Sequence, residues 1–317
     1  MATRRITLKE LLDMLEDDEI TAEDLEPYVM VNEAASGMFN QRIIPNPATV
    51  ILPGQSGDFQ LQADLVLRAV NDYQKDKRNS IFEKRKSLGY RPLIVAEGDS
   101  WFQFPRKPKD TIDHLIDRGY AIKCLSAAGD TLAQMRGHEE YINVFRETGA
   151  TIFMLSGGGN DVLGGGDLKR LLKPYAPRQS AEWHINDNFD VALNEAIDLY
   201  RQILSVVLQN TGVTALIHGY DYVIPNGGRW LGEPMADRNI TDPRLQREIA
   251  RVMIERFNGR LSTLPHEFPG RVVYVNQREA VGDLLDEWFD ELHPNTEGYG
   301  RVAARFHDAI SALLAAP

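Results

Sequence analysis

A chain of 317 residues with 43% hydrophobic and 26% charged residues has an ordinary globular composition, long enough for one α/β domain with an appendage or for two domains. Its formal net charge of -11 argues against a nucleic-acid partner, whose phosphates require a basic face. The single cysteine, Cys124, cannot form an internal disulfide, and its apolar neighbours predict a buried, inert thiol. The sequence shows no secretory leader and no apolar run of about 20 residues, so we expect a cytoplasmic protein without a membrane span.

The first 90 residues are expected to be mainly helical. Leucines recur at helical spacing over residues 7–19, and Thr21 with Asp24 forms a capping box for a short second helix. Residues 31–58 are rich in proline and glycine, which predicts a loop with at most a short strand. A third helix is predicted over residues 59–86, and the cations in its last turn suit the helix dipole.

From residue 91 onward, apolar runs alternate with helical patterns. The runs cover residues 92–96, 120–125, 151–156, 213–218 and 271–275, and the clearest helical patterns cover 187–210, 243–263 and 296–314. Strands that alternate with helices predict a mostly parallel sheet covered on both faces. We therefore expect a helical N-terminal segment of unassigned role over residues 1–90, followed by one three-layer α/β/α domain over residues 91–317.

A candidate nucleophile and base follow from the rule that ligands bind beyond the carboxyl ends of parallel strands. Ser100 comes directly after the first apolar run, within Gly98-Asp99-Ser100, and a serine hydroxyl needs a base to become nucleophilic. His293 lies just before the last helix, three residues after Asp290, so the carboxylate can turn back and orient the imidazole. Each motif alone has an ordinary structural interpretation: a turn or capping serine, and a solvated loop histidine with a capping aspartate.

Two further turns offer hydrogen-bond donors for a developing oxyanion. Gly129 can present its backbone N–H without a side chain in the way, and Asn160 can present its amide. The glycines at 157–159 also suggest a phosphate loop. However, no Gly-Lys-Ser/Thr follows them, and the third glycine of a dinucleotide fingerprint is missing.

The chain resembles the SGNH/GDSL hydrolase superfamily, because four short blocks occur in the order typical of that superfamily. They are Gly98-Asp99-Ser100, Ser126-x-x-Gly129-Asp130-Thr131, Gly157-x-Gly159-Asn160-Asp161 and Asp290-x-x-His293-Pro294. Trp101 stands where many members carry leucine, and the resemblance covers about residues 91–315. The Gly-x-Ser-x-Gly pentapeptide of the competing α/β-hydrolase elbow does not occur.

The resemblance implies a flavodoxin-like sandwich with a parallel sheet of five strands. It also implies Ser100 as nucleophile, His293 as base and Asp290 as the residue that orients the base. The backbone N–H groups of Ser100 and Gly129 and the side chain of Asn160 would form the oxyanion hole.

Three other residues are candidates for substrate binding. His218 ends the fourth apolar run, which suggests a position at the rim of the site, and Tyr220 could supply a hydroxyl donor. Trp101 could line an acyl pocket, although packing of the first helix would explain it equally well. The other histidines lack ligand spacing, so we expect no metal. Residues 219–241 are expected to form a long loop that overhangs the site.

We therefore expect a cofactor-free esterase or deacylase that forms an acyl-enzyme on Ser100, with a small-molecule, lipid or sugar acyl ester as substrate. Transfer of the acyl group to an alcohol by the same residues is the alternative within enzymes. The alternative from another class is a ligand- or partner-binding protein of low activity, in which the N-terminal helices bind a protein partner.

Overall fold

The computed structural model describes residues 4–17, 20–32, 43–53, 59–105, 107–163 and 168–315. Its centre is a five-stranded, fully parallel sheet with the strand order β6-β5-β7-β8-β9. The strands are β5 (Leu93–Glu97), β6 (Ala121–Cys124), β7 (Ile152–Leu155), β8 (Thr214–His218) and β9 (Val272–Val275). In chain order this is the 2-1-3-4-5 arrangement of flavodoxin-like folds, so the predicted sandwich is confirmed.

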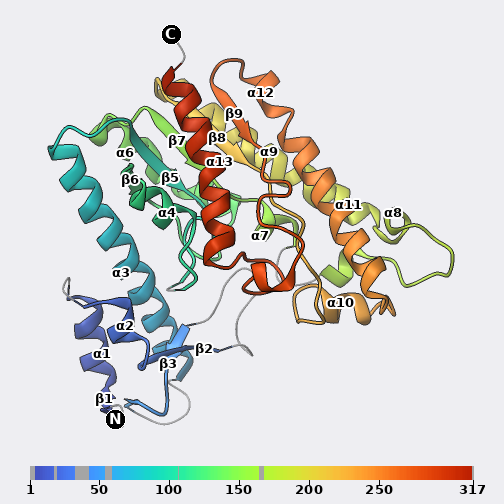
Figure 1. Cartoon of the computed structure of the whole chain (residues 1–317), viewed down its shortest axis with the longest axis horizontal. Coiled ribbons are helices and arrows are strands. Elements are labelled where there is room, and N and C mark those ends of the chain that lie inside the picture. Colours follow the sequence, from blue (N-terminus) through green and yellow to red (C-terminus); the bar gives the residue numbers. More distant parts are fainter. Residues whose placement is uncertain are drawn as a thin grey trace.

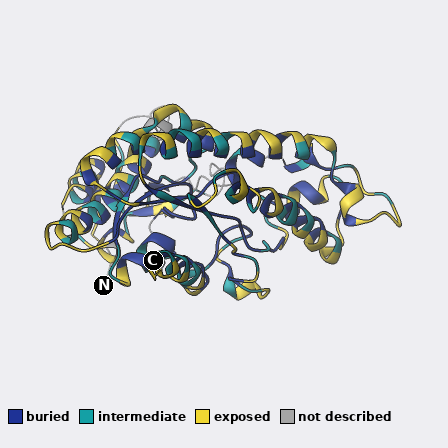
Figure 2. Ribbon diagram, turned by 90° about the horizontal axis from the view of Figure 1, so that it is seen from above, coloured by how far each residue is buried: buried dark blue, intermediate teal, exposed yellow. Residues whose placement is uncertain are grey.

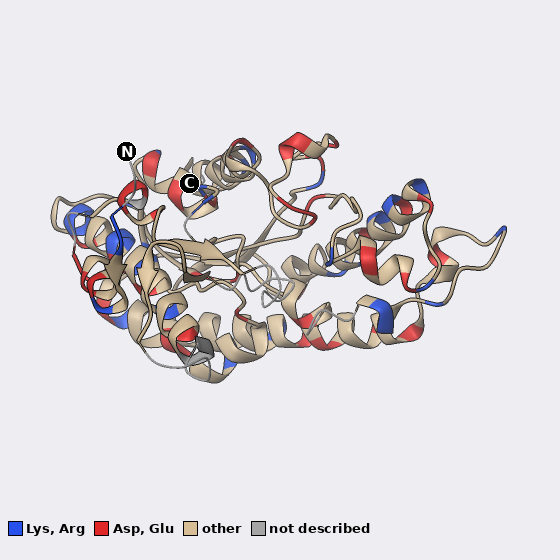
Figure 3. Cartoon of the chain, turned by 90° about the horizontal axis from the view of Figure 1, so that it is seen from below, with Lys and Arg blue, Asp and Glu red and all other residues tan. Residues whose placement is uncertain are grey.

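The central strands are apolar because the sheet is covered on both faces. Every residue of β5 and β7 is buried, as expected for a parallel sheet between two helical layers. Helices α4 (Thr111–Asp117) and α13 (Thr296–Ala315) contact each other, and α9 (Asp187–Asn210) contacts α5 (Leu132–His138) and α6 (Glu140–Thr148). Figure 2 shows helices above and below the buried strands, and Figure 3 shows the charged residues mainly on these outer helices.

The N-terminal segment forms a small unit beside the sheet (Figure 1). Thr7 caps α1 (Leu8–Leu15) through a capping box with Glu10, and Thr21 and Asp24 are hydrogen-bonded at the start of α2 (Ala22–Leu25). The described part of 31–58 holds more strand than predicted, since β1 (Ile6–Thr7) pairs with β4 (Val50–Ile51) and β2 (Val29–Val31) pairs with β3 (Ile43–Pro45). Residues 33–42 and 54–58 lie outside the described part.

Helix α3 (Phe59–Ser87) takes part in two hydrophobic cores. Val66 and Val70 pack in the N-terminal cluster, whereas Phe82 belongs to the main core and α3 contacts β6. Near the main core the buried Arg78 pairs with Asp110, the N-cap of α4, with 2.6 Å between the nitrogen and the oxygen. The domain boundary at residue 90 stays a prediction. Helix α3 ends before that residue, yet it packs against the cores of both predicted parts.

Further helices and short turns complete the described part of the chain. They are α7 (Gly159–Val162), α8 (Ala181–His184), α10 (Gly232–Ala236), α11 (Pro243–Leu261) and α12 (Leu264–Glu267), with short 3-10 turns η2 (Leu168–Leu171) and η3 (Leu285–Glu287). The segment 219–241, expected to be loop, therefore contains the short helix α10. Within the described ranges, no helix combines the length and apolar character needed to cross a bilayer.

Candidate active site

Ser100 lies in a tightly packed turn directly after β5. Gly98 is required there, because a Cβ at this position would lie 2.7 Å from the Cβ of Ser156. The buried Asp99 carboxylate accepts hydrogen bonds from the backbone N–H of Trp101 at 3.0 Å and from the Ser156 hydroxyl at 2.7 Å. These contacts connect the turn to the end of β7 and hold the serine at the carboxyl edge of the sheet.

Ser100, His293 and Asp290 form a continuous hydrogen-bonded chain. The Oγ of Ser100 lies 2.9 Å from Nε2 of His293, and Nδ1 of His293 lies 2.9 Å from both carboxylate oxygens of Asp290. Ser100 and His293 are each 1% exposed, and the ring of Phe104 packs edge-on against the imidazole with centroids 4.9 Å apart. The structure therefore brings together the three residues that the sequence motifs predicted to act together.

Asp290 is held as a carboxylate by its surroundings. Its Oδ1 accepts hydrogen bonds from the backbone N–H groups of Leu292 and His293, each at 2.8 Å. Burial raises the pKa of Asp290, but the interactions with the His293 ring and these hydrogen bonds outweigh it, so the pKa lies below its usual value. An ionised Asp290 accepts a hydrogen bond from Nδ1, which leaves Nε2 as the acceptor for the Ser100 hydroxyl.

The predicted oxyanion donors lie on two turns that are hydrogen-bonded to each other. Gly129 adopts a left-handed conformation, with φ of +88°, and Asn160 donates from Nδ2 to the carbonyl of Asp130 at 2.7 Å. A primary amide nitrogen carries two hydrogens, so one remains for another acceptor. Among the described residues, none accepts a hydrogen bond from the backbone N–H of Ser100 or of Gly129. The turn of Ser100 is linked to the Gly129 turn by a bond from Ala127 N to Gly98 O at 3.0 Å.

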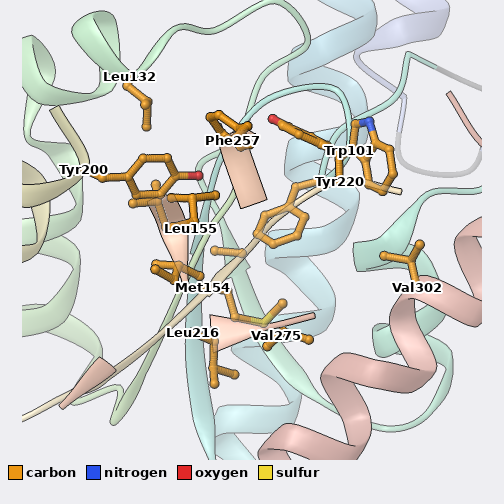
Figure 4. Close-up of a cluster of buried hydrophobic side chains, with 14 of the residues drawn as sticks. Trp101, Leu132, Met154, Leu155, Tyr200, Leu216, Tyr220, Phe257, Val275 and Val302 are labelled. Atoms are coloured by element: carbon orange, nitrogen blue, oxygen red, sulfur yellow. The ribbon is translucent and has the colours of Figure 1, made fainter. Parts of the chain in front are cut away.

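The three candidates for substrate binding have different environments. His218 was expected at the rim, but it is 0% exposed and stacks on Phe102 with centroids 5.4 Å apart, and burial lowers the pKa of its imidazole. Tyr220 does not offer a free hydroxyl, because that group lies 2.7 Å from Asp99 Oδ2. The indole of Trp101 packs edge-on against the Tyr220 ring at 5.0 Å, and Figure 4 shows both rings in the buried cluster. An apolar cavity borders these two rings but not His218.

Glu291 is a site residue that the sequence analysis missed. It lies between Asp290 and Leu292 in the chain, and its side chain is 2% exposed. Its carboxylate accepts the backbone N–H groups of residues 226, 228, 230, 231 and 232, at 2.8 to 3.1 Å. The glutamate thereby fastens the overhanging segment to the loop that carries His293. No sequence signal separates such a glutamate from a solvated one.

Two further carboxyl groups near the site, the buried Glu97 and the half-buried Asp130, have no cationic partner in hydrogen-bond contact among the described residues. Glu97 ends β5 directly before Gly98, and burial raises the pKa of its carboxyl to about 8. Burial likewise raises the pKa of Asp130 to about 6. At pH 7 most of the Glu97 carboxyl is therefore in its protonated form, and it accepts a hydrogen bond from Gly98 N at 3.0 Å. Within the described ranges no group of His, Cys, Asp and Glu side chains is arranged to hold a metal ion.

No family model matches this sequence, and no curated protein is similar enough to match it. Solved structures resemble it at low identity. An acetylxylan esterase from Geobacillus stearothermophilus is 14% identical, with a TM-score of 0.46 over 69% of this chain and 94% of its own. An extracellular lipase from Streptomyces rimosus is 12% identical, with a TM-score of 0.47 over 69% of this chain and 100% of its own. A candidate GDSL-like lipase from Bacteroides ovatus is 15% identical, with a TM-score of 0.44 over 71% of this chain and 54% of its own. The solved neighbours are thus GDSL-like lipases and acetylxylan esterases, too distant to transfer an activity.

Proposed function

We propose that this protein is a serine hydrolase of the SGNH type that cleaves carboxylic esters through an acyl-enzyme on Ser100. The observation that carries the proposal is the hydrogen-bonded chain from Ser100 Oγ through His293 to Asp290, with each step at 2.9 Å. This geometry activates a serine, because the unprotonated Nε2 of His293 lies close enough to accept the proton of the Ser100 hydroxyl. A serine with only a structural role in the turn would require neither His293 nor Asp290.

The reaction that this arrangement supports has two balanced steps. Ser100 Oγ attacks the ester carbonyl while its proton moves to His293 Nε2, and the same proton then leaves with the departing alcohol. Water next attacks the acyl carbon, gives its proton to His293, and the serine takes that proton back as the acid departs. Asp290 stays ionised throughout and holds the imidazole in the required tautomer.

The negative charge of each tetrahedral intermediate needs donors on the far side of the carbonyl. The backbone N–H groups of Ser100 and Gly129 have no acceptor within the described part of the chain, and the Asn160 amide has a hydrogen to spare. These three donors are the groups we assign to the oxyanion hole. Because Ser100 and His293 are buried and these donors are fixed in advance, they stabilise the charge more than water would.

A fluorophosphonate probe tests the proposal. Its tetrahedral adduct resembles the acyl-transfer intermediate, so labelling should reach one per chain and map to Ser100 by peptide mass spectrometry. Ser100→Ala should abolish labelling, and His293→Ala should slow it by orders of magnitude. A matched control is Ser262→Ala, which removes a serine hydroxyl bonded to the carbonyl of Gly259 at the end of α11 and should leave the labelling of Ser100 unchanged. Folded protein that stays unlabelled would instead indicate a binding module built on this fold.

A further inference from the structure

An apolar cavity lies beside the candidate active site. Its wall includes Trp101, Gly159 and Leu292, which are the chain neighbours of Ser100, Asn160 and His293. All three elements that carry the site thus contribute to one cavity. Its other side is formed largely by α11, including Ala250 and Met253.

The cavity offers almost nothing to a polar ligand. Every described residue in its wall is uncharged, and only Trp101 and Tyr220 carry a side-chain nitrogen or oxygen. The Tyr220 hydroxyl is already engaged, since it lies 2.7 Å from Asp99 Oδ2 and 2.9 Å from the carbonyl of Gly157. A hydroxyl, amine or carboxylate placed here would lose its hydration without gaining partners, and that loss is strongly unfavourable.

The cavity volume limits the length of a bound chain. The space open to the centres of water-sized groups is about 60 Å³, so the cavity accommodates several such groups. Methyl and methylene groups are of comparable size. An acetyl group would leave most of this space empty, whereas a long fatty acyl chain would overfill it.

We propose that this cavity binds the acyl chain of the substrate and that the preferred substrates are esters of short, unbranched apolar acids longer than acetate. The proposal rests on the ester hydrolase function proposed above and names its substrate class. The acyl carbon must lie against Ser100, so the chain enters between Trp101 and Gly159 and runs toward Ala250 and Met253. The alcohol part of the ester then lies outside this cavity.

A series of p-nitrophenyl esters from acetate to dodecanoate tests the proposal on the full chain. The kcat/KM value should rise about fourfold per methylene from acetate, reach its maximum at butyrate or hexanoate, and fall for longer chains. Ala250→Leu shortens the cavity and should lower the hexanoate-to-acetate ratio at least tenfold. Met253→Ala lengthens it and should move the maximum to a longer chain. Met154→Ala removes the same side chain from the buried core of β7, outside the cavity wall, and should leave the maximum unchanged.

Because each ratio is measured within one variant, partial loss of folding does not alter the result. A maximum at acetate, or equal ratios in Ala250→Leu, Met253→Ala and Met154→Ala, would overturn the acyl-chain assignment. If those results came with full fluorophosphonate labelling of Ser100, the hydrolase function would stand and only the cavity assignment would fail. If folded protein showed neither labelling nor hydrolysis, both the hydrolase function and the acyl-chain assignment would be wrong.

Discussion

Asn160 has one amide hydrogen bonded to Asp130 and a second that we assign to the oxyanion hole. Asn160→Ala should therefore lower kcat by about 10²–10³ with a smaller change in KM, because the amide matters most once negative charge has developed. Steady-state kinetics on a butyrate ester measures both constants.

A structural control separates catalysis from folding for this residue. Asn46 donates its amide to the carbonyl of Pro27 in the N-terminal unit, so Asn46→Ala should lower Tm and leave kcat per folded molecule unchanged. If Asn160→Ala behaved in the same way as Asn46→Ala, the amide would have only a structural role.

Glu97 makes the stability of the protein depend on pH in an unusual direction. Its carboxyl releases a proton near pH 4.5 in the unfolded chain and near pH 8 in the folded protein, so the folded state holds one more proton between these values. The free energy of unfolding therefore falls as the pH rises through this window. Asp130, with a pKa raised to about 6, acts in the same direction at lower pH.

Glu97→Gln keeps the shape of the side chain and removes its ionisation. Between about pH 6 and 8 the Tm of the natural chain should fall, whereas the Tm of the variant should change much less and be higher at pH 8. The control variant Glu195→Gln, at an exposed position, should show the same change of Tm with pH as the natural chain. Equal slopes for the natural chain and Glu97→Gln would show that Glu97 does not ionise in this window.

At the scale of elements, one ion pair joins α3 to the segment that follows the nucleophile. Arg78 bonds Asp110 at 2.6 Å and Asp113 at 2.9 Å, and it also donates to the carbonyl of Phe102 at 3.0 Å. Arg78→Met would leave the buried Asp110 carboxylate without its cation, which costs about 3–5 kcal/mol. Denaturant unfolding should show that loss, whereas Arg68→Met, on an exposed part of α3, should change the free energy of unfolding by less than about 0.5 kcal/mol.

The elements themselves could largely be predicted from the sequence. Each strand of the main sheet coincides with a predicted apolar run, although β5 extends one residue beyond the run at 92–96. The capping residue Thr7 correctly predicted the start of α1, because it satisfies a specific backbone N–H group. The double role of α3 could not be predicted, because helical periodicity shows an apolar face but not which core that face meets.

The candidate site could be predicted only in part, for a related reason. Ser100, Asp290 and His293 lie in short motifs whose spacing limits their geometry, and the structure brings them to hydrogen-bond distance of one another. Their catalytic roles stay a prediction. The burial of His218 and the engagement of the Tyr220 hydroxyl depend on contacts between residues far apart in the chain. Local sequence patterns do not predict such long-range contacts.

Across the described part of the molecule, the buried hydrophobic residues form two separate clusters, and one of the two underlies the candidate site. The larger cluster spans the five-stranded sheet and its helices, whereas the smaller one spans α1, α3 and the short strands of the N-terminal unit. The two are joined through α3 (Figure 1). A role of the N-terminal unit in binding a protein partner stays a prediction.

The carboxylate of Glu291 also limits how this protein can change over evolution. Surface loops usually accept insertions and deletions, because their backbone groups are satisfied by water. Here five backbone N–H groups between residues 226 and 232 meet one buried carboxylate, so a change in the length of this segment would leave that charge without its donors. Since Leu231 belongs to the cavity wall, new substrate preferences should arise here through replaced side chains within a segment of constant length.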